Sequence, residues 1–223
     1  MIDMSELNKV YFLSLSGGMD STIAGLKILE NVNNTQVFPI FINYGQKSVD
    51  QEWISVQKVM RKMKEYFECK EILIVDPIRI NLKKIKGYGI FDWSESMLIT
   101  GNEESPYLEN RNMILLSIIA SFAEEKINEK EKAIIITGFR GGYEDTSQSF
   151  VEAINNVFNV LSLRVRVEAP IINYENKALL LKEHSKYSEF WDLTWSCYKP
   201  VEGNPCGKCP ACKDRAKALH MSE

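Results

Sequence analysis

The sequence predicts an α/β fold, in which a parallel five-stranded sheet carries helices on both faces and a small cysteine-rich module follows. One observation is that short apolar runs alternate with longer segments of helical periodicity along the 223 residues. Another is a glycine turn, Ser16-Gly17-Gly18, directly after the first apolar run. The third is that four of the five cysteines fall within the last 27 residues. We therefore divide the chain into an α/β domain, residues 1–190, and a cysteine module, residues 191–223.

The predicted strands and helices alternate along the domain. Strands are expected at Val10–Leu15, Gln36–Ile42, Glu71–Val75, Ala133–Thr137 and Arg164–Ala169. Helices are expected at Asp20–Glu30, Gln51–Phe67, Arg111–Glu125, Phe150–Leu161 and Asn176–His184. In the first helix Ile23, Leu26 and Leu29 recur at helical spacing and are predicted to face the core. Residues 76–106 fit neither pattern and contain Tyr88, Phe91 and Trp93, so we predict an active-site or interface insertion there.

Charge and hydrophobicity restrict the class of protein. The formal net charge of −3 provides no global basic field, so direct nucleic-acid binding is not expected. The N-terminal residues lack the charged and apolar blocks of a signal peptide, and the apolar runs are too short to cross a bilayer. We expect a cytoplasmic protein with no membrane partner.

The glycine turn belongs to a longer string, Ser16-Gly17-Gly18-Met19-Asp20-Ser21, which follows a strand and opens a helix. Glycines let backbone N–H groups approach a phosphate, and the helix N-terminus adds positive potential. The hydroxyls of Ser16 and Ser21 add donors, and Asp20 suits a divalent cation that bridges phosphates. The string lacks the lysine of a Walker A loop and the spacing of a dinucleotide fingerprint. The alternative is a plain glycine turn at a helix start.

The C-terminal cysteines have the spacing C-x8-C-x2-C-x2-C and are Cys197, Cys206, Cys209 and Cys212. Four such thiolates can close a tetrahedral shell around zinc, which indicates a structural site rather than a catalytic one. Unliganded thiols and an iron–sulfur cluster are the alternatives. Cys69 stands apart and is predicted to be a buried thiol, whereas His184 and His220 are predicted to lie on the surface.

Taken together, the motifs resemble those of the 7-cyano-7-deazaguanine synthase (QueC) family, a branch of the PP-loop ATP pyrophosphatases. The resemblance covers almost the whole chain. Its motifs are SGGMDST at 16–22, NYGQ at 43–46, RNMILLSIIASFAE at 111–124, ITG at 136–138, AP at 169–170, TWSCY at 194–198 and CGKCPACKDRAKAL at 206–219.

The resemblance implies an adenine nucleotide alpha hydrolase-like fold and a function. Such an enzyme adenylates the carboxylate of 7-carboxy-7-deazaguanine with ATP and Mg²⁺, takes up ammonia to form the amide, and dehydrates the amide to the nitrile. Zn²⁺ would occupy the cysteine module, and family members pair as homodimers.

The resemblance also assigns roles to individual residues. The catalytic candidates are Ser16, Asp20, Ser21 and Arg111. The candidates for nucleotide binding are Ser16, Gly17, Gly18, Met19, Asp20, Ser21, Tyr44, Gln46 and Gly138. Its candidates for substrate binding are Asn112 and Lys177, the latter with an exposed helix lysine as its alternative. Further candidates for substrate binding, Arg140, Tyr143 and Asp145 together with Glu144, lie in the segment 138–150 that departs from the family, where they are expected to form a different pocket.

One segment departs from the family pattern. Residues 138–150 read GFRGGYEDTSQSF, which is shorter than the family's substrate-binding loop and lacks its Cys-Arg pair. A second hypothesis is therefore an enzyme that joins a deazaguanine to a protein amine, as in QueC-like members of anti-phage defence systems. A third is a nucleotide-binding assembly module without turnover.

Overall fold

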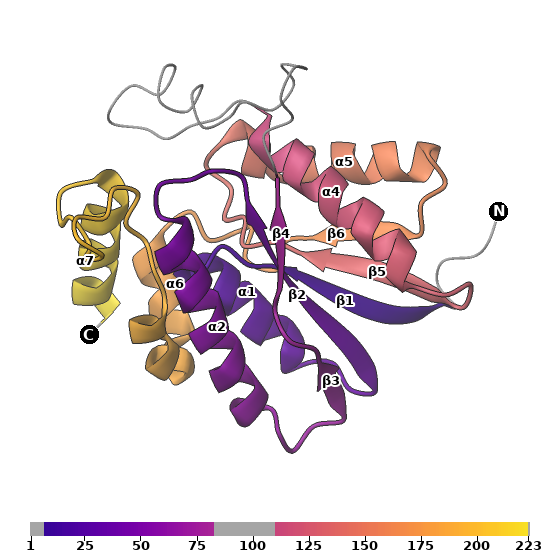
Figure 1. Cartoon of the computed structure of the whole chain (residues 1–223), viewed down its shortest axis with the longest axis horizontal. Coiled ribbons are helices and arrows are strands. Elements are labelled where there is room, and N and C mark those ends of the chain that lie inside the picture. Colours follow the sequence, from indigo (N-terminus) through magenta and orange to yellow (C-terminus); the bar gives the residue numbers. More distant parts are fainter. Residues whose placement is uncertain (1–6, 83–109, 223) are drawn as a thin grey trace.

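The computed structural model describes residues 7–82 and 110–222. Its centre is a parallel sheet of six strands (Figure 1). The strands are β1 (Asn8–Ser14), β2 (Thr35–Asn43), β3 (Ile72–Ile74), β4 (Ile78–Asn81), β5 (Glu131–Ile136) and β6 (Val165–Glu168). Their order is β3-β2-β1-β5-β6, with β4 also paired to β2. The predicted α/β class with a parallel sheet is confirmed.

The sixth strand arises because one edge of the sheet is broken. β3 pairs with the first part of β2, from Thr35 to Val37, and β4 pairs with its last part, from Ile40 to Asn43. Pro77 lies between β3 and β4 and has no N–H group to donate to a ladder. The predicted insertion at 76–106 was therefore wrong for residues 78–81, which belong to the sheet. Its aromatic residues lie outside the described part of the chain.

Two hydrophobic cores lie on opposite faces of the sheet, because side chains alternate along each strand. In β1, Tyr11 and Leu13 join one core, and Val10 and Phe12 join the other. The first core is covered by α1 (Met19–Leu29) and α2 (Val49–Tyr66), and the second by α4 (Arg111–Lys126) and α5 (Gln148–Val160). Figure 1 shows helices on both faces. The predicted inward residues Ile23, Leu26 and Leu29 are fully buried.

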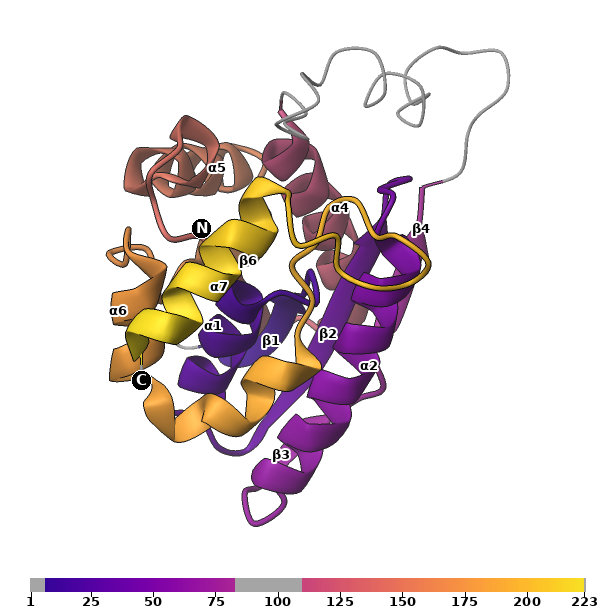
Figure 2. The same cartoon turned by 90° about the vertical axis from the view of Figure 1, so that its left-hand side faces the viewer.

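The C-terminal part adds three helical segments: α6 (Lys177–Glu183), the 3₁₀ segment η2 (Ser185–Leu193) and α7 (Pro210–Ser222). α7 packs beside α6 (Figure 2), and its buried Ala218 joins the core under α1 and α2. The sequence analysis placed no helix in this tail. Pro210 at the first helical position was the signal for it, since proline is favoured there.

Two minor predictions were wrong. His184 is buried, because η2 brings Tyr187 over its ring and its Nδ1 lies 2.9 Å from the carbonyl of Leu180. Cys69 is exposed in the turn between α2 and β3. His220 is exposed, as expected. Within residues 7–82 and 110–222, no helix is both long and apolar enough to cross a membrane.

Candidate nucleotide site and cysteine cluster

The glycine loop joins β1 to α1 in a conformation that requires glycine at its centre. Gly17 has φ +74°, and a Cβ there would lie 2.6 Å from the carbonyl oxygen of Glu52. The carbonyl of Gly17 accepts a 2.8 Å hydrogen bond from the N–H group of Trp195. The loop is thus clamped between α2 and the segment that leads into the cysteine module.

The N-terminus of α1 is open toward a ligand. Gly18 is its N-cap residue, and it makes no side-chain capping bond. The hydroxyls of Ser16 and Ser21 lie 3.2 Å apart, and the Ser21 hydroxyl donates to the carbonyl of Gly18 at 3.2 Å. N–H groups of the first helical turn and two hydroxyls therefore converge on one spot, an arrangement suited to an anion.

A cavity of about 340 Å³ lies beside this loop, where β1, β2 and β5 end. Ligands of open α/β sheets bind at the carboxyl ends of the strands. The cavity is lined by eleven of the residues predicted from the sequence: Ser16, Gly18, Met19, Asp20, Ser21, Tyr44, Gln46, Arg111, Asn112, Gly138 and Lys177. Four other predicted residues, namely Gly17, Arg140, Tyr143 and Asp145, are not among those lining it.

Gly138 permits the close approach of β5 to the glycine loop. A Cβ on Gly138 would lie 2.5 Å from the backbone nitrogen of Ser21 and 2.7 Å from its Cα. Gly138 lies near the end of β5 beside the cavity, as predicted. Because it has no side chain, the backbone of α1 can pack directly against it.

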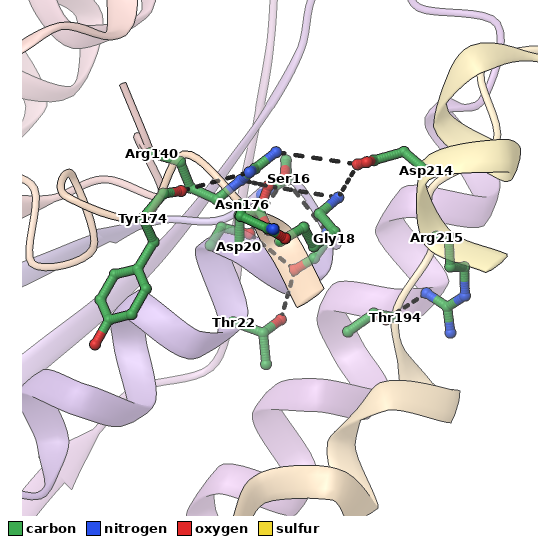
Figure 3. Close-up of polar contacts among 12 residues, drawn as sticks. Ser16, Gly18, Asp20, Thr22, Arg140, Tyr174, Asn176, Thr194, Asp214 and Arg215 are labelled. Carbon is green, nitrogen blue, oxygen red and sulfur yellow. Dashed lines mark hydrogen bonds and ion pairs between the residues drawn. The ribbon is translucent and has the colours of Figure 1, made fainter. Parts of the chain in front are cut away.

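Asp20 belongs to a group of four charged side chains (Figure 3). Nε of Arg140 donates to Oδ2 of Asp20 at 2.9 Å, and Nζ of Lys177 lies 3.6 Å from the same oxygen. Asp214 of α7 completes the group, with its Oδ2 3.1 Å from the Lys177 amine and 4.0 Å from Nη2 of Arg140. The Lys177 side chain is only 11% exposed, so the alternative of an exposed helix lysine is wrong.

The Asp20 carboxylate has capacity left for a cation. Its Oδ1 is buried and has no hydrogen-bond partner among the described residues. Carboxylate oxygens are ligands that Mg²⁺ prefers. The orphaned oxygen therefore fits the divalent cation expected from the sequence, although Oδ2 is already paired.

The polar groups of Gln46 are used within the protein. Its Nε2 donates to Oε2 of Glu52 at 2.8 Å and to the Ile42 carbonyl at 3.3 Å, while its Oε1 accepts from the N–H group of Tyr44 at 3.0 Å. Gln46 thus lines the cavity and holds the loop after β2 in shape. It brings Tyr44 to the wall, where the Arg111 guanidinium lies 6.0 Å from the ring centre.

Glu52 is a cavity residue that the sequence analysis missed. Burial raises the pKa of Glu52 above its usual value of 4.5, against the lowering effects of Ser48, Gln46 and Arg111. Its position in the first turn of α2, six residues after Gln46, was the available signal. A half-buried carboxyl with a raised pKa that lines a cavity is a recognised mark of functional sites.

The segment after β5 places its predicted residues differently. Asp145 accepts a 2.8 Å hydrogen bond from the Asn112 side chain and fixes that amide at the cavity wall. Tyr143 is 72% exposed. Asp145 therefore supports the cavity through Asn112 without lining it, and the Tyr143 side chain lies on the surface outside the cavity.

The four cysteines of the tail form one cluster. Their Sγ atoms lie within 4.8 Å of one another. Backbone N–H groups of Lys208 and Cys209 point at the Cys206 sulfur, at 3.5 and 3.4 Å, and lower the pKa of Cys206 to about 6. Since Zn–S bonds are about 2.3 Å long and tetrahedral, the cluster is compatible with zinc.

Fold and site together define the class: an α/β protein with a glycine loop at the head of its parallel sheet, in a geometry suited to an anion, and a cysteine cluster compatible with zinc. The family model described as "Queuosine biosynthesis protein QueC" matches residues 11–223. The chain belongs to the QueC family.

Curated relatives carry names that agree with this family. The chain is 30% identical over 221 residues to 7-cyano-7-deazaguanine synthase 1 of Desulfitobacterium hafniense (strain Y51), with 97% of this chain and 93% of the relative covered. It is 29% identical to the 7-cyano-7-deazaguanine synthase of Methanobrevibacter smithii, with 94% and 92% covered. A relative of that name from Marinomonas sp. is 29% identical, with 97% and 94% covered. Family membership and these synthase names support an enzymatic role.

Proposed function

We propose that the protein is an ATP-dependent ligase that converts 7-carboxy-7-deazaguanine into 7-cyano-7-deazaguanine. The observation that carries the proposal is the uncapped N-terminus of α1, which opens beside Ser16 and Ser21 into a cavity lined by Arg111 and Lys177. The names of the relatives supply the product, 7-cyano-7-deazaguanine, and the acid substrate is what the family resemblance implies.

The reaction begins with activation of a poor electrophile. A substrate carboxylate oxygen bonds to the α-phosphorus of ATP, and the bond to the β-phosphate breaks, so that pyrophosphate leaves. Ammonia then adds to the acyl carbon, and AMP leaves with the C–O bonding electrons. The amide results after loss of a proton. In a second adenylation the amide oxygen bonds to the α-phosphorus of another ATP, and pyrophosphate leaves. Loss of AMP, with the C–O bonding electrons, and of both protons from nitrogen then yields the nitrile.

The protein contributes position and charge. Backbone N–H groups of Gly18 and the first turn of α1 would hold the departing pyrophosphate, together with the Ser16 and Ser21 hydroxyls. Lys177 and Arg111 would neutralise phosphate and carboxylate charge in the cavity. Asp20 would hold Mg²⁺, which supplies charge neutralisation across the phosphates. The four cysteines would hold Zn²⁺ as a structural ion.

Mass spectrometry of reactions with ATP, Mg²⁺ and 7-carboxy-7-deazaguanine, with and without ammonia, tests the proposal. We expect AMP and pyrophosphate to depend on the acid, and nitrile to depend on ammonia. Asp20→Ala should lower AMP formation by at least an order of magnitude, since the loop loses its carboxylate ligand. Tight ATP binding without acid-dependent AMP would instead identify a nucleotide-binding module.

A protein amine is the alternative acceptor, favoured by the short segment 138–150 and its exposed Tyr143. In that case the activated acid would form with no nitrile product, and proteins encoded beside the gene would gain the mass of the deazaguanine acyl group. The homodimer and the cytoplasmic location stay predictions. Light scattering after gel filtration measures the former.

A further inference from the structure

Asp214 is the one member of the charged group around Asp20 that comes from the cysteine module. It lies on α7, two residues after Cys212, and its carboxylate reaches across to α6 and to the segment after β5 (Figure 3). The sequence analysis gave it no role. It lies within the motif at 206–219, of which only the cysteines were given a role.

Lys177 is held between two carboxylates. Its Nζ lies 3.1 Å from Asp214 and 3.6 Å from Oδ2 of Asp20, and Arg140 already bonds that Oδ2 at 2.9 Å. Arg140 is itself fixed, because its Nη1 donates to the carbonyl of Glu175 at 2.7 Å. Lys177, unlike Arg140, has no hydrogen bond to a backbone carbonyl among the described residues, and Asp214 is the anion nearer to it.

We infer that Asp214 is a positioning residue that holds the Lys177 amine between two carboxylates and so limits its pairing with Asp20, which lets Asp20 take a divalent cation and Lys177 meet the nucleotide phosphates. The inference rests on the proposed function. It deepens that function by giving the cysteine module a part in nucleotide binding.

The physical reason is competition for one carboxylate. Without the Asp214 charge, the nearest anion left to the Lys177 amine among the described residues is Asp20. An amine drawn onto Asp20 would oppose Mg²⁺ there, since two cations cannot share a carboxylate without repulsion. Asp214 therefore acts through Lys177 and needs no contact with the nucleotide.

The way α7 is attached explains how the carboxylate is kept in place. Arg215, the next residue, donates to the Thr194 hydroxyl at 2.8 Å and to the Trp191 carbonyl at 2.6 Å. The cysteine cluster holds the start of the helix, because Cys209 precedes it and Cys212 lies in its first turn. Asp214 thus lies on a helix whose position is fixed by Arg215 and by the cysteine cluster.

Isothermal titration of Mg·ATP into the full-length protein, without the acid substrate, tests the inference. Asp214→Asn should raise the Kd about two- to fivefold, in keeping with the strength of a half-exposed ion pair. Glu202→Gln removes an exposed acid elsewhere in the cysteine module and should leave the Kd unchanged. Zinc content and melting temperature establish that each variant is folded.

A double-mutant cycle isolates the path through Lys177. In a Lys177→Gln background, Asp214→Asn should cause no further change in Kd. An equal effect in both backgrounds, or a Kd for the Asp214→Asn single variant that is unchanged or lower, would overturn the inference.

Magnesium dependence gives a second measurement that needs no Lys177 variant. The effect of Asp214→Asn on ATP binding should be larger with Mg²⁺ than in Mg²⁺-free buffer, where only the contact of Lys177 with the phosphates is left to lose. An effect of the same size in both buffers contradicts competition at Asp20. Failure of the wild-type protein to bind Mg·ATP would count against the proposed function, whereas wild-type binding without a response to Asp214→Asn counts only against the inference.

Discussion

Gly138→Ala is the most direct test of the packing that shapes the nucleotide site. The added Cβ would lie 2.5 Å from the backbone nitrogen of Ser21 and 2.8 Å from the carbonyl carbon of Asp20. Ordinary contacts of a Cβ begin at 3.4 Å, so the start of α1 must shift by about 1 Å. The obstacle is backbone, which cannot turn aside as the end of a side chain can.

Overpacking of this kind costs about 1–3 kcal/mol of unfolding free energy. A chain of this size loses about 2–4 °C of melting temperature per kcal/mol, so a fall of roughly 2–12 °C is expected. A misplacement of about 1 Å at catalytic groups can cost 100-fold in rate. We therefore expect AMP formation to fall on the order of 100-fold, measured beside thermal unfolding.

Gly25→Ala in the middle of α1 is the matched control. Its Cβ would meet only the ends of Leu13 and Met63, at 3.3 and 3.5 Å, which are flexible side chains. Replacing a helix-interior glycine with alanine favours folding by up to about 1 kcal/mol. A Gly138→Ala protein that matched the wild type in melting temperature and turnover would refute the reasoning.

Three further predictions concern the module and the cavity. Cys206→Ser should lower bound zinc well below one ion per chain and reduce the melting temperature, because the tetrahedral shell loses a thiolate; elemental analysis and calorimetry measure both. Replacement of Arg215 by Met removes its bonds to Thr194 and Trp191 and should cost about 1.5–3 kcal/mol in urea unfolding, whereas a loss under 0.5 kcal/mol would contradict an anchoring role. Burial raises the pKa of Glu52 above 4.5. The folded chain therefore keeps the Glu52 proton to a higher pH than the unfolded chain does. As a result, the stability of the wild type falls as the pH rises from 4.5 through the folded pKa. Glu52→Gln does not titrate, so wild-type stability relative to this variant should fall across that window in unfolding titrations; a difference independent of pH would argue against the raised pKa.

The sequence predicted most of the sheet and helices because their signals are local. The residues of β1 face the two cores in turn, so all of them are apolar and the strand is visible as an apolar run. The inward face of α1 follows from helical spacing. β4 escaped prediction because the apolar–polar alternation of its four residues, IRIN at 78–81, is too short to stand out beside the irregular residues around it. They form a strand only because the last part of β2 offers them a partner.

The candidate site was predicted only in part, because local patterns are visible in a sequence and contacts between distant residues are not. The residues of the glycine loop are contiguous, so a motif finds them. Arg140 was predicted to bind substrate, but its side chain is taken up by Asp20 and the Glu175 carbonyl. Such pairings join residues more than thirty positions apart, and no local pattern records them.

What the sequence by itself determined is the fold class, the glycine loop and the four cysteines, since each depends on the order of residues within a short segment. Only the tertiary structure decided that Gly138 makes room for the backbone of Ser21, that Glu52 lines the cavity, and that Asp214 reaches Lys177. These relations depend on distances between elements. Those distances are set when the two cores pack against the sheet and α7 docks on α6.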